Sequence, residues 1–151
     1  MIAFVSGDLL AAKVEALVNP VNTVGVMGKG LALAFKKAFP ANFKAYEAAA
    51  KAGALAVGSV FVFEAVGLVQ PRYILNFPTK AHWRDPSKLS YVEDGLRDLV
   101  RVVRARKIGS IAIPALGAGL GGLPWDDVRP LITRGLAELE DVEIQVFAPL
   151  G

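Results

Sequence analysis

The 151-residue chain contains no cysteine and a single histidine, His82. Without cysteine it forms no disulfide and no thiolate nucleophile, so we expect a cytoplasmic protein. One histidine without a carboxylate cluster is not a transition-metal site, and we expect no metal and no cofactor. No apolar run reaches the ~18 residues that span a bilayer, and the N-terminus lacks a basic region followed by a signal core, so we expect no membrane association.

Composition indicates one compact domain. Hydrophobic residues make up 54% of the chain and charged residues 21%, which is not the balance of a disordered segment. There is no linker, repeat or low-complexity stretch, so we expect a single domain over residues 1–151, acting as a monomer. The net charge of +3 with a pI near 9.3 leans mildly toward anionic partners.

Short apolar runs alternate with helical patterns along the whole chain. This alternation predicts an α/β fold, a three-layer α/β/α sandwich around a mixed, largely parallel sheet. Three local signals set expected boundaries: Asn42 as a helix cap, Pro78 as the end of a strand, and Ser90-x-x-Glu93 as a capping box. We expect strands at 1–6, 16–18, 59–65, 73–77, 110–114 and 142–147, and helices at 31–39, 43–52, 90–108 and 124–139.

The stretch from Val18 to Phe39 contains the first pattern that indicates a ligand-binding site. Two amides, Asn19 and Asn22, follow a short strand, and glycines at 25, 28 and 30 lead into a helix. Glycine lets backbone N–H groups approach a ligand, and a helix N-terminus favours negative charge. The pattern is typical of a phosphate cradle, or equally of a tight connection that uses Asn in its turns.

Three loops are expected beyond the carboxyl ends of strands, where α/β proteins bind ligands: 19–30, 78–89 and 115–123. The third contains Gly117-x-Gly119-x-Gly121-Gly122, which imitates a dinucleotide fingerprint. It follows a late strand, and no acidic residue stands where the ribose would need one. Two glycine loops together favour backbone contacts to both phosphates of a diphosphate; the alternative is two tight connections.

Several motifs, taken in order over the whole chain, resemble the macrodomain family, which binds ADP-ribose. They are Gly7-Asp8-Leu9, Val18-Asn19-Pro20-Val21-Asn22, the loop up to Met27-Gly28-Lys29-Gly30-Leu31-Ala32, the run 114–122 and Val146-Phe147. The first glycine loop and the lysine after Asn76-Phe77-Pro78-Thr79 resemble its lysine-dependent branch. That branch includes terminal ADP-ribose protein glycohydrolases and DNA ADP-ribosyl glycohydrolase antitoxins, and the chain is more similar to the antitoxins.

The resemblance implies roles for individual residues. Asp8 would accept from the adenine amino group, Phe147 would cover the adenine face, and the catalytic pair would be Lys80 at the anomeric carbon and Asn22 at the distal ribose. Without the resemblance, Asp8 is a turn cap, Phe147 a core residue and Lys80 a solvated lysine. The implied ADP-ribose-binding residues are Asp8, Leu9, Asn19, Asn22, Met27, Gly28, Gly30, Leu31, Pro114, Leu116, Gly117, Ala118, Gly119, Leu120, Gly121 and Phe147.

The same resemblance implies a substrate and a partner. The substrate would be thymidine-linked ADP-ribose in single-stranded DNA, and the partner a cognate DNA ADP-ribosyltransferase toxin. The loop after Lys80 places cations beside an aromatic ring, as DNA-binding surfaces do, through His82, Trp83, Arg84 and Lys88. The alternative is an ordinary solvated charged loop. Three other functions stay open: a non-catalytic ADP-ribose-binding module, an ADP-ribose 1″-phosphate phosphatase, and a nucleic-acid-binding module without hydrolysis.

One position departs from the lysine-dependent pattern. Terminal glycohydrolases of the branch carry an acidic residue where this chain has Gly121, so their lysine–carboxylate pair is incomplete here. Asp126 and Asp127 follow closely, but acids in a first helical turn are more simply explained by the helix dipole.

Overall fold

A computed structural model describes residues 1–67 and 70–149. Six strands form one sheet in the order β1-β6-β5-β2-β4-β3, and every pairing is parallel except β3 with β4. This confirms the mixed, largely parallel sheet. The strands are β1 (Ile2–Val5), β2 (Ala16–Asn22), β3 (Phe61–Glu64), β4 (Tyr73–Lys80), β5 (Ser110–Ile113) and β6 (Glu143–Phe147).

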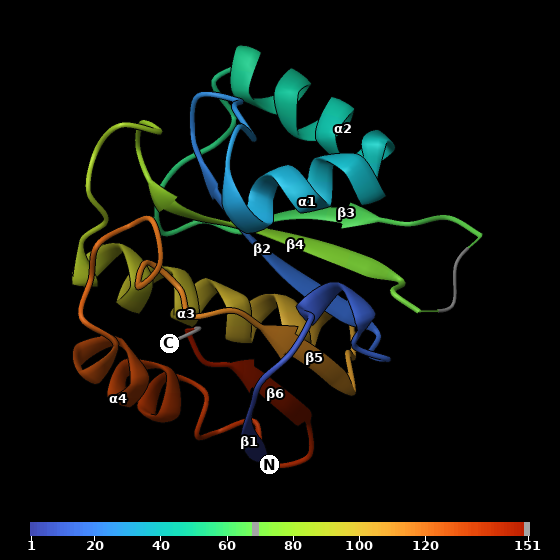
Figure 1. Cartoon of the computed structure of the whole chain (residues 1–151). Coiled ribbons are helices and arrows are strands. Elements are labelled where there is room, and N and C mark those ends of the chain that lie inside the picture. The colour runs from blue at the N-terminus through green and yellow to red at the C-terminus, as the bar shows by residue number, and fades with distance from the viewer. Residues whose placement is uncertain (68–69, 150–151) are drawn as a thin grey trace.

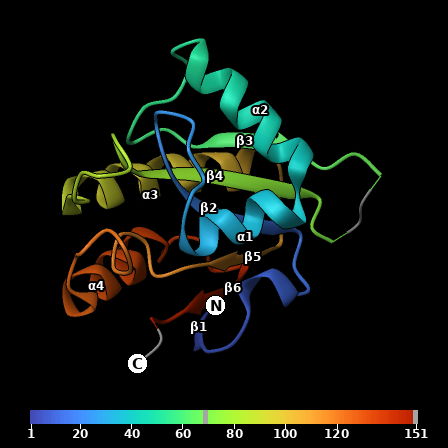
Figure 2. The same cartoon turned by 45° about the horizontal axis from the view of Figure 1, so that its top comes forward.

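Helices cover both faces of this sheet (Figures 1 and 2). One face carries α1 (Gly30–Ala38) and α2 (Pro40–Lys51), and the other carries α3 (Leu89–Ala105) and α4 (Trp125–Gly135). A short 3-10 helix, η1 (Leu9–Ala11), follows β1. The predicted three-layer sandwich is therefore confirmed. No helix in the described part of the chain is both long and apolar enough to cross a membrane.

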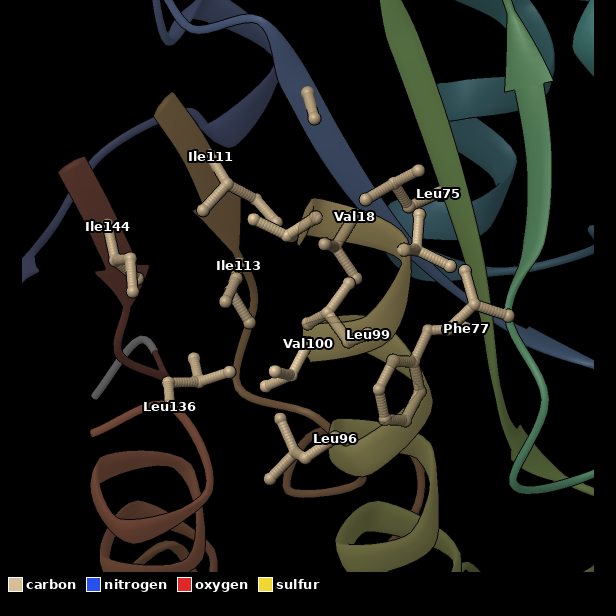
Figure 3. Close-up of a cluster of buried hydrophobic side chains, with 14 of the residues drawn as sticks. Val18, Leu75, Phe77, Leu96, Leu99, Val100, Ile111, Ile113, Leu136 and Ile144 are labelled. Atoms are coloured by element: carbon tan, nitrogen blue, oxygen red, sulfur yellow. The ribbon is translucent and has the colours of Figure 1, made fainter. Parts of the chain in front are cut away.

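Alternation along the strands divides the core between the two faces. Val18 and Leu75 face α3, where they meet Leu99, and Figure 3 shows this larger cluster. Their neighbours Leu17 and Ile74 point to the opposite face and belong to a smaller cluster with Phe35 of α1. Successive side chains of a strand point to opposite faces, so each face of the sheet has apolar side chains against which a layer of helices packs.

Two strands run further than the sequence predicts. β2 continues to Asn22 and β4 to Lys80, so Pro78 does not end its strand. β5 pairs with β2 only at Ala16 and Leu17, and β3 pairs with β4 only as far as Asn76. Pro20 and Pro78 therefore lie where each strand has a single partner, so the missing N–H costs no ladder bond on the open side.

Two helix boundaries also differ from expectation. Asn42 does not cap α2 but lies inside it, fully buried, with its amide nitrogen 3.2 Å from Asn76 Oδ1. The predicted capping box does not form, because α3 begins at Leu89 after Lys88 and has no side-chain cap. Glu93 instead pairs with Arg97 one turn later, at 2.7 Å.

The early end of the β2–β5 pairing opens the sheet at the carboxyl ends of these strands. The chain leaves β2 toward α1 on one face and leaves β5 toward α4 on the other (Figure 1). Neighbouring strands whose connections diverge in this way leave a crevice between their loops.

Candidate functional site

A cleft of about 1170 Å³ lies at this divergence. Its walls come from the loop after β1, the end of β2 with the loop into α1, the end of β4 with its following loop, the loop after β5, and the residues after β6. The charged side chains that line it are Asp8, Lys29, Lys80, Arg84 and Asp85. Three cations against two carboxylates favour an anionic ligand.

The first glycine loop ends in the N-terminus of α1 at the cleft. Gly30 has φ +57°, a conformation that glycine adopts without strain, and it turns the chain into the helix. No side chain caps α1, so the N–H groups of its first turn face the cleft without a side-chain partner from the described residues. Lys29 precedes them and lines the cleft. Sequence reasoning did not assign Lys29, although its place before a helix was a signal.

The second glycine loop is folded on its own backbone. Leu123 donates to the Gly117 carbonyl at 2.9 Å and Gly122 donates to the Gly119 carbonyl at 3.2 Å, with Gly117 at φ +74°. Within residues 1–67 and 70–149, the N–H groups of Gly119, Leu120 and Gly121 donate to no backbone acceptor. All three residues line the cleft. Open backbone donors from two loops of the cleft can hold the two phosphates of a diphosphate.

Asn22 and Lys80 are cross-strand neighbours in the β2–β4 pairing, next to a register shift. Asn22 is 7% exposed and Lys80 is half-buried, and both line the cleft. The Lys80 ammonium donates to the Trp83 carbonyl at 3.3 Å and makes no ion pair with a carboxylate of the described residues. The structure thus brings together the two residues for which the family resemblance implies a catalytic role.

Asp8 and Phe147 lie at the other end of the cleft. β1 and β6 are paired in parallel, with Val5 opposite Phe147, so their carboxyl ends reach the cleft together. Asp8 Oδ1 accepts from Leu10 N at 3.0 Å and caps η1, which leaves its second oxygen for a ligand. The turn-cap reading of Asp8 is therefore correct and does not exclude a binding role.

Of the other predicted site residues, some line the cleft and others are buried behind its lining or lie outside it. Asn19, Met27 and Leu116 are buried and do not line the cleft; Asn19 Nδ2 donates to Asn76 Oδ1 at 3.1 Å. Trp83 and Arg84 line it, whereas His82 and Lys88 lie outside. The predicted ADP-ribose-binding residues that do line the cleft are Asp8, Leu9, Asn22, Gly28, Gly30, Leu31, Pro114, Gly117, Ala118, Gly119, Leu120, Gly121 and Phe147.

The position that departs from the lysine-dependent pattern is sterically closed. A Cβ on Gly121 would collide with Ser87 Oγ and with the Gly117 carbonyl. Ser87 also donates its N–H to the Gly121 carbonyl at 3.0 Å. Asp126 and Asp127 occupy the first turn of α4, as expected, and do not line the cleft. Asp85 does line it, and sequence reasoning missed this residue because nothing in a charged loop marks which side chain turns inward.

The described residues contain no group of three His, Asp or Glu side chains that could hold a metal ion. The cleft offers backbone N–H groups, the half-buried Lys80, two further cations in Lys29 and Arg84, the Asn22 amide and two carboxylates. Such a set can bind an anionic ligand through its phosphates and present the far end of that ligand to Lys80.

Comparison with known proteins places this geometry in a family. The Macro domain profile matches residues 18–132. The DNA ADP-ribosyl glycohydrolase of Thermus aquaticus is 56% identical over 150 residues, which are 99% of this chain and 42% of that protein. This chain thus spans less than half the length of that relative.

Solved structures agree. The macrodomain of Thermus aquaticus DarG has a TM-score of 0.95 at 56% identity, with 99% of both chains covered. Thermosipho africanus DarTG in complex with ADP-ribose has a TM-score of 0.93 at 38% identity, over 99% of this chain and 42% of that one. The chain belongs to the macrodomain family.

Proposed function

We propose that this macrodomain is a DNA ADP-ribosyl glycohydrolase that removes ADP-ribose from thymidine in single-stranded DNA. The observation that carries the proposal is the pairing of Lys80 with Asn22 at one end of a cleft with open backbone donors. The names of the similar Thermus aquaticus protein and of the ADP-ribose complex from Thermosipho africanus support it.

In this proposal the cleft holds ADP-ribose along its length. The adenine lies between Asp8 and Phe147, the diphosphate lies between the two glycine loops, and the distal ribose reaches Asn22 and Lys80. Stacking of a base on an aromatic ring contributes about 1–3 kcal/mol. Binding energy from the adenosine half fixes the distal ribose against Lys80, so that remote contacts assist bond cleavage.

The reaction is a hydrolysis at the anomeric carbon of the distal ribose. The bond from this carbon to the base breaks, the base leaves with the electron pair and takes up a proton, and the oxygen of water ends on the carbon. Lys80 is the side chain of the described cleft that acts at this carbon, and Asn22 orients the ribose hydroxyls. Because Gly121 admits no side chain, the reaction proceeds without an acid at that position.

The loop that follows Lys80 is proposed to hold the DNA. Trp83 is 51% exposed, and its ring has the Arg84 guanidinium 5.8 Å from its centre. An exposed aromatic ring with an adjacent cation suits an unstacked base and its phosphate. His82 and Lys88 extend the same loop outside the cleft.

A DNA substrate places this activity in the cytoplasm. We further propose that the protein is the antitoxin of a cognate DNA ADP-ribosyltransferase, DarT, whose modification it reverses. The name of the Thermosipho africanus DarTG structure, which is similar over 99% of this chain, supports the pairing.

The test is incubation with an oligonucleotide that carries ADP-ribose on thymidine. The comparison substrate is a protein that carries ADP-ribose on its carboxylates. We expect unmodified oligonucleotide and free ADP-ribose as the products, and slower release from protein. Tight ADP-ribose binding with no release would instead identify a binding module, and phosphate release from ADP-ribose 1″-phosphate would identify a phosphatase.

A further inference from the structure

Tyr46 is a fully buried residue of α2 whose hydroxyl contacts Asn22, a residue that lines the cleft. It lies 2.7 Å from the Asn22 backbone oxygen and 2.8 Å from Asn22 Oδ1, and donates its hydrogen to this pair of acceptors. Its exposed fraction is 0%, so it does not touch a ligand in the cleft. Any effect of Tyr46 on the site must act through Asn22.

Asn22 is held by a nearly complete set of hydrogen bonds. Its Oδ1 accepts from Val24 N at 3.1 Å and from Val26 N at 3.3 Å, while Nδ2 donates to the Val26 carbonyl at 2.8 Å. These partners fix which end of the amide is nitrogen, because a backbone N–H only donates and a carbonyl only accepts. One hydrogen of Nδ2 is left at a residue that lines the cleft.

We propose that Tyr46 is a positioning residue, which fixes the Asn22 amide and the turn 22–26 so that Nδ2 donates its remaining hydrogen to the distal ribose. The inference deepens the proposed function and rests on it. The group that this amide would recognise is a hydroxyl of the ribose beyond the second phosphate. ADP-ribose has this ribose and ADP lacks it.

A second contact from α2 supports the same role. Gly25, at the tip of the turn with φ +88°, approaches the helix so closely that an added Cβ would lie 3.0 Å from Ala50 Cβ. Ala50 lies one turn after Tyr46, so α2 supports the turn at two successive positions. Burial raises the pKa of Tyr46 to about 12, so its hydroxyl stays protonated and donates throughout the neutral range.

The test compares two ligands on Tyr46→Phe, which keeps the buried ring and removes the hydroxyl. We expect ADP to bind within twofold of the wild-type protein, and ADP-ribose to bind roughly three- to tenfold more weakly, the range of one lost hydrogen bond. Calorimetric titration of both ligands measures this selectivity. A role confined to stability would lower both affinities equally or neither, and either result would overturn the proposal.

A double-mutant cycle with Asn22→Ala tests the route of the effect. In the Asn22→Ala background, Tyr46→Phe should change ADP-ribose affinity by less than twofold, because its amide partner is already absent. Full additivity would contradict action through Asn22. Asn22→Asp provides a second variant: it keeps the acceptor for Val24 and Val26 but has no Nδ2 hydrogens, so it should weaken ADP-ribose binding more than ADP binding.

Tyr73→Phe is the matched control, since Tyr73 is a buried tyrosine at the start of β4, at the far end of the strand from Lys80. Its affinities for both ligands should equal those of the wild-type protein. Because the readout is binding, it is separable from the proposed reaction. A protein that binds ADP-ribose but frees none from DNA would count against the reaction and leave the Tyr46 comparison intact.

Discussion

At Gly121, the absence of a side chain is a packing requirement. The space where a Cβ would stand is filled by Ser87 Oγ and the Gly117 carbonyl, and Gly121 itself is buried. The loop that follows β4 and the loop that follows β5 therefore meet at this residue. The sequence shows that an acid is missing at this position, and the structure shows that a Cβ there would require Ser87 or the Gly117 carbonyl to shift.

We expect Gly121→Ala to lower the free energy of unfolding by about 1–3 kcal/mol, the usual cost of overpacking. Gly119→Ala is the control, because an added Cβ at Gly119 meets no atom within 4 Å and its backbone does not require glycine. Urea unfolding of both variants measures the difference. Equal stabilities would show that the contact with Ser87 does not constrain the loop.

Single residues could be predicted from the sequence where a motif or a local pattern marks them. Asp8, Asn22 and Lys80 belong to the motifs that carry the macrodomain resemblance, and all three line the cleft. Tyr46 and Asp85 were not predicted. A tyrosine in an alanine-rich helix looks like ordinary core, and its partnership with Asn22 joins residues 24 positions apart.

At the scale of elements, the loop of residues 81–88 is anchored to the turn after β2 and also contributes side chains to the cleft. Thr23 donates both its N–H and its hydroxyl to the Ala81 carbonyl, at 3.2 and 2.6 Å, which ties this loop to the turn after β2. Beyond that tie, Trp83 projects at the cleft with His82 beside it, their ring centres 5.1 Å apart. The loop is thus anchored near Lys80 and open where DNA is proposed to bind.

Trp83→Ala should weaken binding of the modified oligonucleotide by about 5- to 150-fold, which corresponds to the 1–3 kcal/mol of one stacked base. Free ADP-ribose should bind within twofold of wild type, because it carries no thymine to stack. Fluorescence anisotropy with both ligands makes the comparison, with Trp83→Phe as a variant that keeps an aromatic face. Equal losses for the two ligands would place Trp83 at the ADP-ribose itself.

Strand ends were harder to predict than the strands themselves. The apolar cores of β2 and β4 are evident, but the predicted strands end at Val18 and Phe77, before Pro20 and Pro78. Whether a proline ends a strand depends on how many partners flank it, and the partners β5 and β3 stop before these residues. Pairing partners are tertiary information, so the placement of Lys80 on a strand required the structure.

At the scale of the whole molecule, the alternation of strands and helices is sufficient to predict the layered fold. The position of the cleft depends on strand order, because it forms where β2 and β5 are neighbours with connections on opposite faces. Five segments that are distant in the sequence meet at this point. A ligand bound along the cleft therefore contacts both halves of the sheet.

ADP-ribose should consequently stabilise the whole domain in one transition. At a concentration 100 times its Kd, linkage gives about 2.7 kcal/mol. For a domain of this size, that corresponds to a rise in Tm of roughly 5–10 °C. Differential scanning calorimetry measures it, with ribose 5-phosphate as a control that lacks the adenine and the diphosphate. An absent shift, or one equalled by the control, would contradict binding along the whole cleft.

The most direct measurement is single-turnover release of ADP-ribose from a thymidine-modified oligonucleotide by the wild-type protein and by Lys80→Ala. Lys51→Ala is the control, because Lys51 is an exposed lysine at the end of α2, outside the cleft. We predict rapid release by the wild-type protein and by Lys51→Ala, and a loss of at least about 100-fold in Lys80→Ala with ADP-ribose binding retained. Release at the wild-type rate by Lys80→Ala would contradict the account.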